Sequence, residues 1–85
     1  MVDSFLLETY VPEARAAEAR DAGRRARTAA EELAGEGTRI RYVRTTFLPE
    51  DETCFHLFEA QSAEAVREAG RRAGLGPIRV VGAVE

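Results

Sequence analysis

Glu8, Arg44 and His56 are the residues of this chain best suited to proton transfer or to binding a charged ligand. His56 is the only histidine in 85 residues. An imidazole beside a carboxylate is the usual pair for moving a proton, and it can also start a metal site. Arg44 could hold an anionic group through two parallel hydrogen bonds, or it could neutralise Glu8. In an enzyme, Glu8 or His56 would act as the base while Arg44 holds an anionic oxygen.

Plainer interpretations stand beside these. His56 could be an interface histidine paired with a carboxylate. Cys54, the only cysteine, is more often a small apolar packing residue than a nucleophile. One His and one Cys are too few for a complete zinc site in one chain. Metal binding would therefore rest on Glu8 and His56, completed by water, other carboxylates or a second subunit.

These residues lie in segments that read as strands and helices. Short apolar runs predict strands at residues 4–11, 38–48, 53–60 and 78–84. Residues 13–34 are rich in Ala, Arg and Glu and predict a helix that begins after Pro12. A second, shorter helix begins after the N-cap residue Ser62 and ends near Gly74. The order is β-α-β-β-α-β.

This order predicts a ferredoxin-like α+β fold in a single domain, residues 1–85. Such a fold has a four-stranded antiparallel sheet with two helices on one face, and the first and third strands are central. Alternation along each strand then assigns side chains to faces. We expect the helices to cover Phe5, Leu7, Val43, Phe47, Phe55 and Leu57.

The opposite face of the sheet would carry Leu6, Glu8, Tyr10, Tyr42, Arg44, Cys54, His56 and Phe58. In an enzyme or a ligand-binding protein, Tyr10, Tyr42, Cys54 and Phe58 would surround the ligand. This face is too apolar to stay in water as a broad patch. We therefore expect a homodimer joined face to face, a dimeric α+β barrel. A strand shifted by one residue would exchange all its side chains between faces.

Composition and charge limit the kinds of partner that the protein is expected to bind. The net charge of −3 and the pI near 5.2 argue against a nucleic-acid-binding protein. The basic cluster at residues 24–27 is interpreted as a solvated helix face. No apolar run reaches the ~20 residues of a membrane span, and the N-terminus lacks the basic start of a signal peptide. With one cysteine, a cytoplasmic location is expected.

Several segments carry a resemblance to a known family. They are FLLE at residues 5–8, IRYVRT at 40–45, TCFHLFEA at 53–60, SAEAVRE at 62–68, RRAGL at 71–75 and the run at 78–84. Together they resemble a family of small bacterial ferredoxin-like proteins that includes a nickel-binding protein. The resemblance implies a sheet-mediated dimer and a possible site for nickel or another divalent transition metal. Such members often carry His where Arg44 stands and near Ala69 or Gly70; here Glu8 and His56 remain as ligands.

Three functions follow from these observations. The first is a small homodimeric protein that binds a ligand or a metal on the open sheet face. The second is a cofactor-free enzyme of the isomerase, cyclase or oxygenase type, acting on a hydrophobic metabolite within the barrel. The third is a structural or regulatory dimer without a small ligand.

Overall fold

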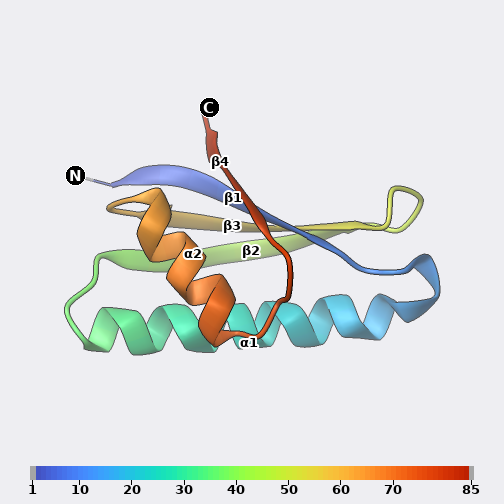
Figure 1. The fold of residues 1–85 in the computed structure, drawn as a ribbon, viewed down its shortest axis with the longest axis horizontal. Helices are drawn as coiled ribbons and strands as arrows, with labels where there is room; N and C mark the ends of the chain where they lie inside the picture. The colour runs from blue at the N-terminus through green and yellow to red at the C-terminus, as the bar shows by residue number, and fades with distance from the viewer. Residues whose placement is uncertain (1, 85) are drawn as a thin grey trace.

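The computed structural model describes residues 2–84 and has the predicted β-α-β-β-α-β order (Figure 1). Its elements are β1 (Asp3–Tyr10), a short 3-10 helix η1 (Glu13–Arg15), α1 (Ala16–Gly35), β2 (Ile40–Leu48), β3 (Thr53–Ala60), α2 (Ala63–Arg72) and β4 (Arg79–Ala83). The strand order is β2-β3-β1-β4, and every neighbouring pair is antiparallel. The ferredoxin-like fold and the central places of β1 and β3 are thus confirmed.

Local chemistry fixes where the helices begin. Pro12 precedes η1, where its missing N–H removes no helical hydrogen bond. α2 begins as predicted, because the Ser62 Oγ accepts a hydrogen bond of 3.2 Å from the Ala65 N–H. Within the described residues, neither helix is long and apolar enough to cross a membrane.

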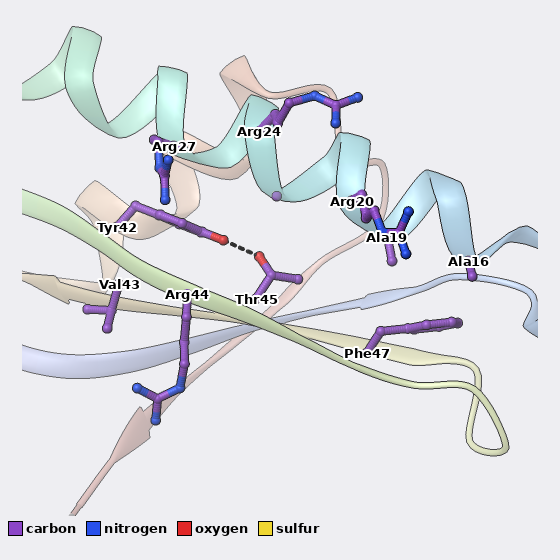
Figure 2. Close-up of a pocket in the computed structure, with 11 residues that line it drawn as sticks. Ala16, Ala19, Arg20, Arg24, Arg27, Tyr42, Val43, Arg44, Thr45 and Phe47 are labelled. Carbon is purple, nitrogen blue, oxygen red and sulfur yellow. Dashed lines mark hydrogen bonds between the residues drawn. The ribbon is translucent and has the colours of Figure 1, made fainter.

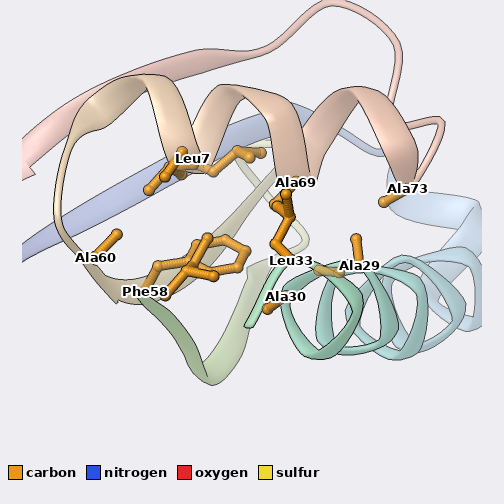
Figure 3. Packing of buried hydrophobic residues seen from close by; sticks show 12 residues of the cluster. Leu7, Ala29, Ala30, Leu33, Phe58, Ala60, Ala69 and Ala73 are labelled. Atoms are coloured by element: carbon orange, nitrogen blue, oxygen red, sulfur yellow. The ribbon is translucent and has the colours of Figure 1, made fainter. Parts of the chain in front are cut away.

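Small residues let both helices lie close to one face of the sheet. The buried stripe of α1 consists of Ala19, Ala22, Gly23, Ala26, Ala29, Ala30 and Leu33. It meets α2 and the sheet around Leu7 and Phe58 (Figure 3). At Gly70 of α2, an added Cβ would lie only 2.7 Å from Ile78 and 2.8 Å from Leu7. The core is therefore packed tightly around side chains of alanine size.

The face assignment of β1 is correct, but that of β3 is reversed. Leu7 lies under the helices and Glu8 on the open face, as predicted. The structure instead buries Cys54, His56 and Phe58 of β3 completely, while Phe55 and Leu57 are only partly buried.

The pairing register explains the reversal in β3. Leu7 lies directly opposite His56, so both side chains point to the helices. Beneath the alanine-rich α1, the small side chains of Cys54 and Ala60 suit the closely packed face. Phe58 fills the centre of the core. Both sets of alternating residues in β3 contain apolar side chains, so hydrophobicity alone did not distinguish the faces.

A β-bulge changes the phase of β2. Tyr42 pairs with Phe58 and Arg44 with Leu57, so Val43 is an extra residue between two successive pairs. Tyr42 consequently packs on the helix side, whereas Val43 points away from α1 (Figure 2). Both placements are opposite to the prediction. Arg44 on the open face and Phe47 under α1 agree with it.

Candidate functional site

The sheet separates the three residues predicted to form a site. Glu8 and Arg44 are on the open face, and His56 is on the face covered by helices. Even Glu8 and Arg44 do not meet, because β3 runs between their strands. Within residues 2–84, no ion pair joins them. The predicted pairing of a carboxylate with the imidazole is therefore absent from this arrangement.

His56 is a buried, neutral histidine. Its side chain is fully buried, and its Nδ1 lies 2.7 Å from the Thr45 Oγ1. Its Nε2 has no hydrogen-bond partner among the residues described. Burial, with a smaller contribution from the positive charge of Arg25, lowers the pKa of His56 to about 4. At neutral pH the ring is uncharged and shielded from solvent.

A chain of hydrogen bonds links His56 to the edge of the sheet. The Tyr42 hydroxyl lies 2.5 Å from the Thr45 Oγ1, which in turn contacts His56. An unpartnered N–H in a core is rarer than an unpartnered acceptor, so the proton belongs on Nδ1. Nδ1–H then donates to the Thr45 Oγ1, and the Thr45 and Tyr42 hydroxyls share a hydrogen bond that either of them can donate. One of the two hydroxyl protons is therefore not used in the chain.

The Tyr42 hydroxyl lies in a groove between α1 and β2 with a volume of about 560 Å³ (Figure 2). The guanidinium carbon of Arg27 lies 5.3 Å from the centre of the Tyr42 ring, a cation–π arrangement. The groove is lined by Ala16, Ala19, Arg20, Gly23, Arg24, Arg27, Tyr42, Val43, Arg44, Thr45 and Phe47. None of the carboxylates in the described part of the chain belongs to this lining.

The other predicted ligand-binding residues lie apart from one another. Tyr10 is 69% exposed and donates a hydrogen bond of 3.3 Å to Glu52. The negative charge of Glu52 raises the pKa of Tyr10. Cys54 is buried, and this burial raises the pKa of its thiol, which keeps it protonated. Phe58 is a core residue that contacts the edge of the Tyr42 ring at 5.8 Å between centres.

The residues of a single chain do not fit a nickel site. Within residues 2–84, no group of three or more His, Cys, Asp and Glu side chains is placed to hold a metal ion. Ala69 and Gly70, near which the resemblance implies a second His in other members, are both buried in the core. The close contacts of Gly70 with Leu7 and Ile78 leave no space for an imidazole there.

Sequence reasoning missed the residues that build the groove. Arg20, Gly23 and Arg27 recur at helical spacing and therefore share one side of α1. This spacing could have indicated from the sequence that the three residues line a common surface. The participation of Thr45 was hidden, because only the bulge at Val43 brings Thr45 and Tyr42 to the same face.

One comparison with known proteins identifies relatives. A family model described as "Nickel responsive protein SCO4226-like" matches residues 5–82. No curated protein and no solved structure matches the chain.

Proposed function

The chain belongs to the SCO4226-like family of nickel-responsive proteins, and from this premise we propose that it acts in the response to nickel as a homodimeric binding protein. The open face of the sheet supports this proposal. Val81, Leu6 and Leu57 lie side by side on β4, β1 and β3, and Arg44 continues the row on β2. Neither helix covers this apolar row, and a second copy would bury it.

The charges on the open face suit contact with a second copy. Glu8 and Glu59 share the face with Arg41, Arg44 and Arg79. In a two-fold contact each surface meets itself, so it must carry charges of both signs to avoid repulsion. The open face meets this requirement. The free, buried Cys54 also supports the expected cytoplasmic location, where thiols stay reduced.

We favour binding over catalysis because the proposed catalytic groups are separated. The enzyme alternative needs Glu8 or His56 as a base near Arg44, but His56 is on the other face and neutral. Glu8 and Arg44 alone offer an acid–base group and an anion-holding group on different strands. The third alternative, a structural or regulatory dimer, uses the same interface without a small ligand.

Sedimentation analysis tests the dimer. Leu57→Glu places a charge in the centre of the apolar row, and we expect it to convert a dimer into a folded monomer. Thr28→Glu adds the same charge at an exposed position of α1 and should leave the dimer intact. A wild-type protein that remains monomeric at high micromolar concentration would contradict the proposal, as would a Leu57→Glu variant that remains a dimer.

Titration calorimetry with Ni²⁺ tests the link to the metal. Because residues 2–84 of one chain bring no set of three donors together, we infer that direct binding would use Glu8 from each copy together with water. That arrangement predicts at most one Ni²⁺ per dimer, lost in Glu8→Gln and in the Leu57→Glu monomer. If the wild-type dimer shows no saturable heat, the nickel response does not involve a metal on this face. The sedimentation result would still decide whether the dimer exists.

A further inference from the structure

We propose that the groove between α1 and β2 binds a small organic carboxylate, held by Arg20 and Arg27 with its apolar body against Phe47. This site is on the helix side of the sheet, so it does not depend on the dimer or on nickel. Four features of the groove support the proposal: the sign of its charge, the spacing of its arginines on α1, the hydrogen-bond donors that face it and its lining of both polar and apolar side chains.

The groove has the opposite charge to the protein as a whole. The chain carries a net charge of −3, yet among residues 2–84 the charged side chains that line the groove are Arg20, Arg24, Arg27 and Arg44, with no acidic residue. The side chain of Arg44 points away from α1 (Figure 2), so its charge lies on the open face of the sheet. A concave surface of one sign concentrates ligands of the other sign.

Arg20 and Arg27 differ from the other arginines of α1 in having no acidic partner. Arg24 and Arg25 both pair with Asp21, at 3.2 and 2.9 Å. Within the described part of the chain, no carboxylate lies within ion-pair distance of Arg20 or Arg27. Their guanidinium groups thus remain available for a carboxylate, whose geometry they match.

Gly23 brings the two arginines close to the hydroxyl groups of β2. Arg20 and Arg27 are seven residues apart, so they project from the same side of α1 with Gly23 between them. A Cβ at Gly23 would lie 2.8 Å from the Thr45 Oγ1 and 3.3 Å from the Tyr42 hydroxyl. Only glycine permits α1 to approach this closely, and the hydroxyl pair becomes the floor of the groove.

The groups that face the groove are hydrogen-bond donors. With the proton of His56 on Nδ1, the Tyr42 and Thr45 hydroxyls use one of their two protons in the bond between them and leave the other for a ligand. The guanidinium groups of Arg20 and Arg27 have donors and no acceptors. A ligand must therefore supply acceptors, as an ionised carboxylate does.

The apolar part of the lining favours an organic anion over a bare inorganic one. Phe47, Ala16 and Ala19 lie at the end of the groove beyond Thr45 (Figure 2). The volume of about 560 Å³ suits a small molecule, and small-molecule sites commonly combine an apolar wall with a few polar groups. A carboxylate attached to a flat apolar body satisfies both halves of the groove.

Benzoate is a suitable probe, with benzamide as its uncharged counterpart and inorganic phosphate as an anion without an apolar body. We expect NMR titration with benzoate to give saturable shifts at the amides of Tyr42, Thr45 and Phe47. Benzamide and phosphate should bind at least roughly tenfold more weakly, a difference of about 1.4 kcal/mol. Absence of saturable shifts with benzoate would overturn the proposal. Equal binding of phosphate or benzamide would overturn the assignment to an organic carboxylate.

Variants of α1 then test the roles of the two arginines. Arg27→Gln and Arg20→Gln should each raise the benzoate dissociation constant about tenfold. Arg67→Gln is the matched control, because it removes the same charge from an arginine of α2 that pairs with Glu64 at 2.6 Å and does not line the groove. An equal effect of all three substitutions would show general attraction between charges and contradict the site. Tyr42→Phe should weaken binding less, by roughly the value of one hydrogen bond.

Discussion

The two faces of the sheet hold their side chains in different ways, although the same strands supply both. On the helix side, Phe58 and His56 are fully enclosed, and His56 is joined to Thr45. On the open side, Leu57 and Leu6 are only partly buried and lie beside charged residues. Neighbouring residues of one strand therefore experience unlike environments, and a titratable group on one face cannot be paired with a group on the other.

This contrast assigns different roles to the faces. The helix side contributes most of the stability of the fold, because it holds the fully buried side chains of the sheet. The open side contributes little to the stability of a monomer and is available for association. The groove lies at the edge of the sheet, between the helix side and the open side, where α1 passes over the edge strand β2 (Figure 2). Substitutions on each side can test this division.

Removing one aromatic ring from each face in turn should give the largest difference in the free energy of unfolding. Phe58→Ala leaves a cavity in the core, and we expect it to lower the free energy of unfolding by about 3–5 kcal/mol. Phe55→Ala on the open face should lower it by less than about 1 kcal/mol in the monomer. Urea unfolding measures both values. Equal losses would contradict the division, and a loss at Phe55 that grows with protein concentration would support the dimer.

Acid should destabilise the protein through His56. Its pKa is near 4 in the folded state and about 6.5 when unfolded, so the unfolded state binds protons first. Stability is fully present above pH 6.5 and falls as the pH decreases, by about 2 kcal/mol at pH 5. Unfolding by urea at pH 7 and pH 5 measures the difference. His56→Leu should show much less of this dependence, because it removes the buried imidazole.

Replacing a glycine with alanine should have opposite effects on stability at closely packed and at open positions. Gly70→Ala places a Cβ within 2.8 Å of Leu7 and Ile78, and overpacking should lower the free energy of unfolding by about 1–3 kcal/mol. Gly35→Ala is the control, since nothing lies within 4 Å of its added Cβ. It should raise stability by about 0.5 kcal/mol. Thermal unfolding followed by circular dichroism compares them, and a neutral Gly70→Ala would contradict the packing of α2.

The smallest effect is expected for an ion pair on the open face. Arg41→Gln removes the 2.7 Å contact with Glu59, and both side chains are largely exposed. The free energy of unfolding should change by about 0.2–1 kcal/mol. The charge-conserving variant Arg41→Lys, measured in parallel, separates loss of charge from loss of geometry. A change above 2 kcal/mol would show that this edge of the sheet is buried by a partner.

The sequence predicted the fold well because its local signals agree. Pro12, the N-cap Ser62 and the alanine stripe of α1 each point to the elements that form. The faces of β3 were not predictable in the same way. Phe55 and Leu57 compete with Cys54 and Phe58 for the core, and hydropathy does not rank them. The choice depends on register with β1 and on the narrow space beneath α1, which are tertiary properties.

The candidate site was less predictable than the fold. Glu8 and His56 were predicted to form a site because of their residue types. Contact between them depended on which face of the sheet carries the His56 side chain. Arg20 and Arg27 were visible as helix-surface arginines. What sets them apart is the absence of an acidic partner in the described residues, together with the closeness of Gly23 to Thr45. The closeness of Gly23 to Thr45 arises only when α1 lies against β2.

The bulge at Val43 also bears on how this strand can change during evolution. Strict alternation would place Tyr42 and Thr45 on opposite faces, and the extra residue keeps both toward α1. Deleting Val43 would leave them two positions apart and still on one face. The chain can therefore lose a residue here without reversing the rest of β2, whereas a deletion elsewhere in the strand would exchange its faces. Natural variation in length within this strand is expected to concentrate at this position.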